Sequence, residues 1–562
     1  MKKIIALLLA LVMVFALAAC AAKTEAPAAE KKEETPAAEA PKEETKAEEP
    51  AKTEEEKKAE AVAESSVLQE GNKEYTPSDE TLYLANKANP NGLCPLAVTS
   101  ISANNAHMVA LYDRLVSYDY TTNTVGPMLA ESWEQVDDTH VRFHLRKDVK
   151  SHAGDPFTAN DVIYTVTTGQ ESGILSNYYG MFNLAECKAE DDYTVVLATT
   201  NVEPFFMYTM ANTPLSMLVQ ASVEKSGGLE AESLVPTAGT GPYKFVEWAD
   251  GSYIKLERNE EYWDGPAYFK AAEIRIITEA SARVMNLESG DVDIALDPDV
   301  NALVSLKDNA AFSVVNLPTT NITTMYLNCS AEPFKDVNAR RAVASALNYE
   351  ANLKIAAGGY GTLTDTYLPA NNVMHVSPAA SYVKTDVEAA KAALAASAYP
   401  NGFEFELSYK EDPTMAAFAE MVQGQLAEIG ITVNLCPLAA AEFDARISDG
   451  AFDAEMSNAS NPDPAVQTRY YDGRIDFKTM RGGCGYVDGS QELLDLIDAA
   501  KVTIDETERR AIYAKIQEIL ADVVPAVPVY SPNKLCATDA DLVGMKLTEF
   551  CDIDWSGCYR AN

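Results

Sequence analysis

The run from Gly239 to Pro266 constrains the fold more than any other part of this chain. Apolar and polar residues alternate along it on both sides of Asp250 and Gly251. An Asp-Gly pair between two alternating runs is a strong signal for two strands joined by a tight hairpin turn. Gly241 stands just before the first run, so the backbone has to bend sharply as it enters the strand. The spacing predicts a β-hairpin around which the neighbouring chain must be arranged.

The first twenty residues have the pattern of a targeting segment. Two lysines precede an apolar run, residues 4–19, that is too short and too early for a membrane span. The run ends in small residues directly before Cys20, which resembles a bacterial lipoprotein box. We expect cleavage before Cys20 and a lipid on its thiol, which anchors the protein because each buried methylene contributes about 0.8 kcal/mol. The alternative is an ordinary secretory signal with a chance cysteine.

Residues 21–74 are of low complexity, dominated by Ala, Glu, Lys, Pro and Thr, and contain no aromatic residue. Such a composition cannot bury enough apolar surface to offset the conformational entropy lost on folding. We therefore predict a flexible, disordered tether between the lipid and the folded part. Partial helix in residues 54–64 would only stiffen this linker.

The remaining chain, residues 75–562, is several times longer than a single-core domain, so we expect more than one domain. The formal net charge of −39 excludes nucleic acid and anionic membrane surfaces as partners. Eight of the nine cysteines follow Cys20, and their spacing fits neither a small disulfide scaffold nor a zinc ribbon. Cys551 and Cys558 are close enough in sequence to pair. The sequence leaves open whether any pair forms, since a reducing habitat would keep all eight thiols free.

Several short sequence motifs occur in the order typical of one family. They are GTGPYKFVEW and LERNEEYWDG in the hairpin, LAESWEQVDD before it, and ARVMNLESGDVDIAL and TMYLNC after it. Together they resemble the family 5 solute-binding proteins of bacterial ABC importers, which are the dipeptide-, oligopeptide- and nickel-binding proteins. The resemblance covers nearly all of residues 75–531.

This resemblance implies an α/β fold of the periplasmic-binding-protein type II, with two lobes joined by a hinge. The first domain would be discontinuous, comprising residues 75–108, 236–318 and 526–562, with domain II at 109–235 inserted in it. Residues 319–525 would form an additional domain III. The ligand would lie between the lobes, which close around it, and the loaded form would dock on an ABC permease in the membrane.

Local patterns add expectations about single elements. A strand at residues 403–409, an amphipathic helix at 414–429 and a strand at 431–435 imply a parallel pair with a right-handed crossover. Thr385 and Glu388 form a capping-box pattern before the next apolar run.

Three further segments are assigned by pattern and by family order. His107–Ser117 is predicted to be a helix. Asp505–Ala521 is predicted to be a helix with its charges outward, and residues 524–538 a strand that returns to the first domain.

The resemblance also assigns ligand-binding candidates, which stand in loops and at strand ends that border the cleft in the family. These residues are Asn89, Asn91, Tyr179, Tyr326, Asn328, Asn458, Ser460, Asn461 and Asp463. Asparagine is also the commonest loop residue, so the loop candidates have a structural alternative.

The chain departs from the family's peptide binders at one informative point. In those peptide binders, an aspartate at this point holds the α-amino group of the peptide, and an upstream arginine assists in binding a carboxylate. Aligned through Pro464, this chain has Ser460 at the aspartate and no arginine before it. A serine cannot supply a charge-assisted bond to an ammonium group, and Asp463, three residues away, has the wrong spacing for that role. The amide-rich run favours a longer peptide, or a neutral polar solute such as an oligosaccharide, over a dipeptide.

No Ser-His-acid arrangement indicates catalysis, so we expect a non-enzyme that needs no cofactor. The alternatives are nickel binding, a ligand-sensing receptor without transport and an extracellular hydrolase. For nickel, His375 is isolated, and the three histidines between residues 140 and 152 lack a ligand spacing. The run RGGCGY at residues 481–486 lacks the lysine of a P-loop and predicts a loop at the cleft edge. We expect a monomer, lipid-anchored on the extracytoplasmic face of the cell membrane.

Overall fold

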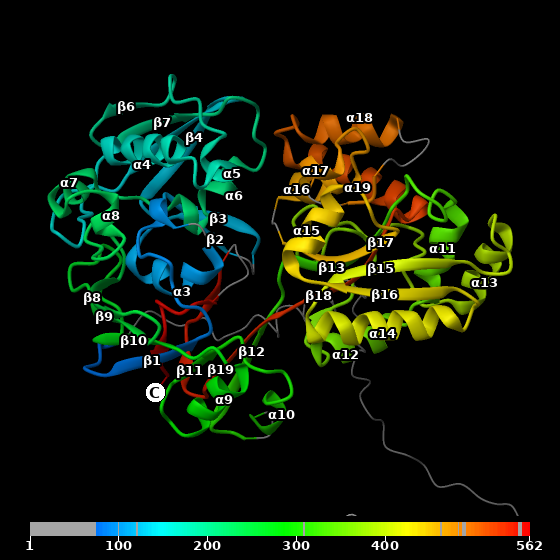
Figure 1. Ribbon diagram of the computed structural model, residues 1–562. Helices are drawn as coiled ribbons and strands as arrows, with labels where there is room; N and C mark the ends of the chain where they lie inside the picture. The colour runs from blue at the N-terminus through cyan, green and yellow to red at the C-terminus, as the bar shows by residue number, and fades with distance from the viewer. Residues whose placement is uncertain are drawn as a thin grey trace, which may run out of the picture. The chain divides into compact units, whose positions relative to one another are not determined.

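The computed structural model describes residues 75–98, 101–119, 122–306, 309–460, 463–480, 483–485, 491–548 and 553–561 (Figure 1). The predicted signal segment with Cys20, the linker and Asn461 lie outside the described residues. No helix in the described part of the chain is long and apolar enough to span a bilayer.

A seven-stranded mixed sheet forms the framework of the first lobe, in the order β12-β19-β11-β1-β10-β9-β8. The strands are β1 (Thr81–Asn86), β8 (Tyr243–Ala249), β9 (Tyr253–Arg258), β10 (Ala271–Ile276), β11 (Ile294–Leu296), β12 (Phe312–Leu317) and β19 (Lys534–Asp539). β1 runs parallel to both β10 and β11, whereas the other neighbours are antiparallel. The predicted hairpin is confirmed as β8 and β9, with Gly251 in the turn at a φ of 69°.

The segment between β1 and β8 builds a second, four-stranded antiparallel sheet in the order β4-β5-β7-β6. Its strands are β4 (Ala130–Asp137), β5 (His140–Leu145), β6 (Lys188–Asp191) and β7 (Thr194–Ala198). The helices of this segment are α3 (Ile101–Leu111), α4 (Ala159–Ser172), α5 (Ser176–Tyr179), α6 (Phe206–Met210), α7 (Gln220–Ser226) and α8 (Leu229–Glu232). A capping box begins α4, with Thr158 and Asp161 bonded reciprocally.

The helix predicted at His107–Ser117 ends earlier than its pattern indicates. α3 stops at Leu111, and the strand β2 (Val116–Asp119) follows. The reason is the buried carboxylate of Asp113, which accepts hydrogen bonds from Tyr262 at 3.0 Å and from Trp263 at 2.9 Å. These long-range bonds hold the chain in a loop where local periodicity favours another helical turn.

A six-stranded sheet forms the framework of the second lobe, in the order β14-β18-β13-β17-β15-β16. Its strands are β13 (Asn321–Leu327), β14 (Gly361–Thr362), β15 (Glu404–Lys410), β16 (Thr432–Leu438), β17 (Ala454–Ser460) and β18 (Ala526–Pro532). The main helices are α11 (Val337–Ala346), α12 (Tyr349–Ala357), α13 (Val387–Ala396), α14 (Pro413–Ala427), α15 (Ala440–Ser448), α16 (Pro464–Thr468), α18 (Gln491–Ala500) and α19 (Glu506–Val523). The predicted parallel pair is confirmed as β15 and β16, and Figure 1 shows α14 lying along both strands.

Two predictions in this lobe need correction. The helix α13 begins with Asp386 as N-cap, whose carboxylate accepts from the backbone N–H of Ala389 at 2.9 Å. Thr385, predicted as the cap, donates its hydroxyl to the carbonyl of Leu347 at 2.8 Å. The strand predicted at residues 524–538 is two strands, because Asn533 separates β18 in the second-lobe sheet from β19 in the first-lobe sheet. On sheet membership, we propose that domain I resumes after Pro532 rather than at residue 526.

The chain passes between the two sheets at β12–β13 and at β18–β19, and hydrogen bonds join these two crossings. The hydroxyl of Thr319 donates to the carbonyl of Pro532 at 2.6 Å. The side-chain amide of Asn533 donates to that of Asn316 at 2.8 Å. Two adjacent, bonded crossings form the hinge between the lobes.

Candidate ligand site

Strand register determines which ends of the sheets face the hinge. In the second lobe, Asn321 at the first crossing pairs with Ser460 at the carboxyl end of β17, and β15 and β16 run parallel to β17. In the first lobe, Leu296 at the carboxyl end of β11 pairs with Cys536 near the start of β19. Ligands of open α/β sheets bind outside the carboxyl ends of parallel strands. Both sheets therefore turn their binding edges toward the hinge.

A cavity of about 570 Å³ lies at this edge. Its wall comes mainly from β13, β15, β17, β18 and α12, while Val300 and Leu535 of the first lobe complete it. The exposed amide of Asn458 lines the cavity and accepts a hydrogen bond from the hydroxyl of Thr323 at 2.8 Å. The side-chain oxygen of Asn533, also in the wall, has no partner among the described residues. The cavity thus offers amide and hydroxyl groups to a ligand, beside the charged side chains of Lys410 and Asp412.

A charged cluster stands where β17 leads into α16. Asp463 is the N-cap of α16 and accepts from the backbone N–H of Ala465 at 2.8 Å. Burial raises the pKa of Asp463 to about 6, although the nearby charge of Arg509 opposes the shift. Burial and the charge of Asp463 also raise the pKa of Glu203, which precedes α6 in the first lobe. The carboxyl group of Asp463, in the second lobe, therefore lies close enough to Glu203, in the first lobe, to affect the ionisation of Glu203.

Two donors on α19 complete this cluster. Arg509 is 2% exposed, its guanidinium lies 4.5 Å from the ring centroid of Phe205, and its Nη1 donates to the carbonyls of Thr503 and Ile504. Within the described part of the chain, the Nε of Arg509 and the hydroxyl of the fully buried Tyr513 have no hydrogen-bond partner. Unsatisfied buried donors are costly, so these two point to a ligand group or water that satisfies them.

The prediction that α19 turns its charges outward is wrong for Arg509. The buried face of the helix contains Arg509, Tyr513, Ile516, Gln517 and Leu520. Arg509 lies four residues before Tyr513, so its side chain is on the apolar face of the helix and not on the opposite, solvent-facing side. Sequence reasoning missed Glu203, Phe205, Arg509 and Tyr513 as site residues, and the position of Arg509 on this face was the one available signal.

The loop candidates Asn89 and Asn91 hold the backbone of the first lobe. Asn89 donates to Asp250 at 2.7 Å and accepts from the backbone N–H of Gly251 at 2.9 Å, which fixes the hairpin turn. Asn91 exchanges two hydrogen bonds with Asn104 of α3, at 3.1 and 2.7 Å. The structure does not bring either residue to the charged cluster.

Tyr179 and Asn328 serve the packing of their own lobes. Tyr179 is 0% exposed, and its hydroxyl donates to the carbonyl of Pro214 at 2.7 Å, so its side chain is enclosed within its own lobe. The amide of Asn328 donates to the carbonyl of Phe452 at 2.8 Å and accepts from the backbone N–H of Ser330. Tyr326 is buried against the rings of Tyr470 and Tyr471, in the same apolar cluster as Phe205 and Tyr513.

Among the remaining candidates, Asn458, Ser460 and Asp463 follow one another along β17 and its continuation into α16. Only the backbone of Ser460 is described, and it pairs with Asn321. The proximity of these residues follows from one strand, whereas their neighbours Glu203 and Arg509 come from distant segments.

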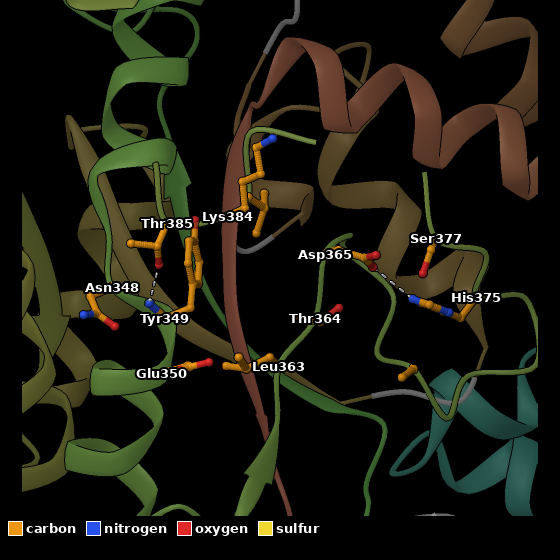
Figure 2. Close-up of a pocket in the computed structure, with 12 residues that line it drawn as sticks. Asn348, Tyr349, Glu350, Leu363, Thr364, Asp365, His375, Ser377, Lys384 and Thr385 are labelled. Carbon is orange, nitrogen blue, oxygen red and sulfur yellow. Dashed lines mark hydrogen bonds and ion pairs between the residues drawn. The ribbon is translucent and has the colours of Figure 1, made fainter. Parts of the chain in front are cut away.

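A second cavity, of about 520 Å³, lies in the second lobe (Figure 2). Asp365 and His375 face each other across 3.2 Å on its wall, and the backbone N–H of Tyr349 donates to the hydroxyl of Thr385. All lining residues lie between Asn348 and Thr385, so only one lobe contributes to it. This cavity is not one on which two lobes close. Across the described residues, no three His, Cys, Asp or Glu side chains are grouped as metal ligands.

Comparisons with known proteins find a matching family and several relatives of this chain. The family model described as bacterial extracellular solute-binding proteins, family 5 Middle, matches residues 124–475. A dipeptide-binding protein of Escherichia coli strain K12 is 26% identical over 478 residues, covering 80% of this chain and 88% of the relative. Heme-binding protein A of Haemophilus influenzae is 26% identical over 483 residues, covering 80% and 87%.

Solved structures show the same fold. The dipeptide-binding protein from Pseudoalteromonas sp. SM9913, in complex with Met-Leu, matches with a TM-score of 0.68 at 22% identity. The match covers 86% of this chain and 100% of that one. The predicted α/β fold of the type II binding proteins, with two lobes, is confirmed. Because the family model spans more than half of the chain, this protein belongs to the bacterial extracellular solute-binding proteins of family 5.

Proposed function

We propose that this protein captures a peptide between its lobes and delivers it to the membrane permease of an ABC importer. The observation that carries the proposal is the cluster of Glu203 and Asp463 beside Arg509 and Tyr513. Two carboxyl groups that are costly to ionise together are relieved by an ammonium group, which a peptide supplies at its amino end. This role for Asp463 revises the expectation from the sequence, which gave Asp463 the wrong spacing to hold an α-amino group. A relative named for dipeptide binding supports the same class of ligand.

The donors on α19 suit the peptide backbone next to that amino group. The Nε of Arg509 and the hydroxyl of Tyr513 would donate to a backbone carbonyl of the ligand. The sequence places Ser460 where the family's peptide binders have an acid and has no arginine before it, so a free carboxyl end is not selected there. The proposal is therefore a longer peptide in preference to a dipeptide, held at its amino end.

The anchoring and location of the protein belong to the same proposal. A lipid on Cys20 would keep the binding protein at the extracytoplasmic face of the cell membrane, within reach of the permease, and the low-complexity linker would set that reach. We propose a monomer, since one chain provides both lobes of the site.

The test combines ligand recovery with affinity measurements. The purified protein is incubated with peptides of two to six residues, and bound species are identified by mass spectrometry. Isothermal titration then compares the best peptide with its N-acetylated form. We expect acetylation to weaken binding roughly tenfold to a hundredfold, because a charged hydrogen bond contributes about 1.5–3 kcal/mol.

Substitutions locate the site. Asp463→Asn keeps an N-cap side chain for α16 but removes the charge, so it should weaken binding to the same degree as acetylation. Tyr513→Phe should weaken it several-fold, by the loss of one neutral hydrogen bond. Asp365→Asn, in the other cavity of the second lobe, is the matched control and should bind as the wild type does. Equal affinity of wild type and Asp463→Asn for every peptide would refute this placement.

A second candidate ligand is a neutral polar solute such as an oligosaccharide. The cavity lined by Thr323, Asn458 and Asn533 favours it, since its wall offers amide and hydroxyl groups. The two charged residues in that wall, Lys410 and Asp412, carry opposite charges. Binding of an oligosaccharide that Asn458→Ala weakens, with no binding of any peptide, would select this alternative.

A further inference from the structure

The glycine-rich run between α17 (Phe477–Met480) and α18 has no part in the proposed ligand site. Its described residues are Gly483, Cys484 and Gly485, which lie against the end of β13. The backbone N–H of Cys329 donates to the carbonyl of Cys484 at 2.8 Å. The N–H of Cys484 in turn donates to the carbonyl of Tyr470 at 3.2 Å. This tripeptide is thus inserted between two neighbouring segments of the second lobe.

The glycines on both sides of Cys484 make that close approach possible. A Cβ atom on Gly485 would stand 2.6 Å from the hydroxyl of Ser330, and one on Gly483 would stand 2.8 Å from the carbonyl of Tyr470. Both glycines also have positive φ angles, of 68° and 106°, which side chains disfavour. Gly483 and Gly485 therefore allow Cys484 to lie against the end of β13.

The side chains of Cys329 and Cys484 meet at this point. Cys329 is 6% exposed and Cys484 is 0% exposed, and their thiols lie close enough for each to shift the pKa of the other. The thiol of Cys329 donates to the carbonyl of Leu327 at 3.4 Å, and that of Cys484 to the carbonyl of Tyr470 at 3.1 Å. The direct backbone hydrogen bond between the two residues brings their Cα atoms close together, as the Cα spacing of about 4.4–6.8 Å in a disulfide requires.

We propose that Cys329 and Cys484 are a site of oxidative modification, forming a disulfide that ties the Gly483–Gly485 segment to the end of β13. The co-reactant is a disulfide, either a small molecule such as oxidised glutathione or a protein dithiol in its oxidised form. The bridge would fix the packing of Tyr326 against Tyr470, because both rings stand beside the tied segment.

The chemistry balances as two successive thiol–disulfide exchanges. The thiolate of Cys329 attacks one sulfur of the oxidant, forms a mixed disulfide and releases the other sulfur as a thiolate. The Cys484 thiol then gives its proton to a thiolate and attacks the sulfur of Cys329, which releases the second oxidant sulfur. The protein loses two electrons and two protons, and the oxidant becomes two thiols.

The surroundings favour Cys329 as the first nucleophile. Burial opposes its ionisation, but the neighbouring thiol of Cys484 and the charge of Arg340 outweigh that effect and lower its pKa. Burial, together with the neighbouring Cys329, raises the pKa of Cys484. Because both thiols are buried, we expect oxidation during folding or local opening and slow oxidation of the closed native protein.

The experiment maps the bridge in the full chain. Protein is refolded from urea in buffers with graded ratios of reduced to oxidised glutathione, free thiols are blocked under denaturing conditions, and digests are analysed by mass spectrometry. We expect a linked pair of peptides carrying Cys329 and Cys484, lighter by two hydrogen atoms than the reduced pair. The oxidised protein should melt roughly 5 °C or more above the reduced one.

Variants separate this pair from the other cysteines. Cys329→Ser and Cys484→Ser should each abolish the melting shift, whereas Cys94→Ser, which removes a buried thiol elsewhere, should retain it. The mapping in wild-type protein keeps the test valid even if a serine variant fails to fold. Free thiols at both positions after refolding in the most oxidising buffer would overturn the proposal. So would a bridge between Cys536 and Cys558 in place of the proposed one.

Discussion

The carboxyl group of Glu455 should make the second lobe less stable as the pH rises from about 4.5 to about 7. Glu455 lies on β17 and is 2% exposed. Its Oε1 accepts a long hydrogen bond of 3.4 Å from the backbone N–H of Gly483, and its Oε2 has no partner among the described residues. Burial raises the pKa of Glu455 from 4.5 to about 7, against smaller lowering effects of Ser457 and Lys410.

The sign of the effect follows from where the proton is held. Because the folded state has the higher pKa, it retains the proton at pH values where the unfolded chain has lost it. The contribution of Glu455 to stability is therefore complete below about pH 4.5 and is lost as the pH rises through about 7. A pKa difference of about 2.5 corresponds to roughly 3 kcal/mol, which is an upper value for the loss.

The substitution Glu455→Gln tests this by removing the titration while preserving shape. The unfolding free energies of wild type and variant are measured by urea denaturation, followed by far-UV circular dichroism, between about pH 4.5 and about pH 8. Taking the difference at each pH cancels every other titrating group. We expect the variant to gain up to roughly 3 kcal/mol relative to wild type across this range.

A matched control is Glu420→Gln, which changes an exposed glutamate on α14. Its difference from wild type should stay nearly constant over the same pH range, because an exposed carboxyl group keeps similar surroundings on unfolding. A pH-independent difference between wild type and Glu455→Gln would show that the buried carboxyl does not hold its proton. The reasoning from burial would then be refuted.

Four further outcomes are expected. Cys20→Ala should abolish incorporation of labelled fatty acid, since no other cysteine precedes residue 75, and equal labelling would contradict the lipid anchor. Gly402→Ala should destabilise by roughly 2 kcal/mol or more, as its new Cβ would stand 1.9 Å from the carbonyl of Gly430. The control Gly424→Ala, in open space on a helix, should be neutral or stabilising in the same melts. Asp386→Ala should cost about 1 kcal/mol by loss of the N-cap, and an unchanged urea midpoint would argue against it. Small-angle scattering should show contraction when a peptide binds, so an unchanged profile with bound peptide would count against hinge closure.

Elements whose stabilising interactions are local can be predicted from the amino-acid sequence alone. The hairpin of β8 and β9 follows from alternation around Asp250 and Gly251, because turn chemistry and pleat act within a few residues. The capping box of Thr158 and Asp161 is local in the same way, because its two residues lie within one helical turn. The parallel pair β15 and β16 follows from the strand–helix–strand order, since a parallel connection requires a crossover.

Where segments far apart in the chain can bond the same polar group, only the folded structure shows which interaction forms. α3 ends at Leu111 because the buried carboxylate of Asp113 is bonded by Tyr262 and Trp263, which no local pattern reveals. Tyr179 occurs in a polar, aromatic run, but the hydroxyl is taken by Pro214 inside the lobe.

The candidate site shows the same division most clearly. Asp463 could be named as a candidate from its position after β17. Its charged neighbours Glu203 and Arg509, however, come from other parts of the chain and are brought to it by the fold. Likewise, the thiols of Cys329 and Cys484 are neighbours only in the folded protein. Local propensity is determined within a few residues, whereas the burial and charge that define a site depend on residues far apart in the chain.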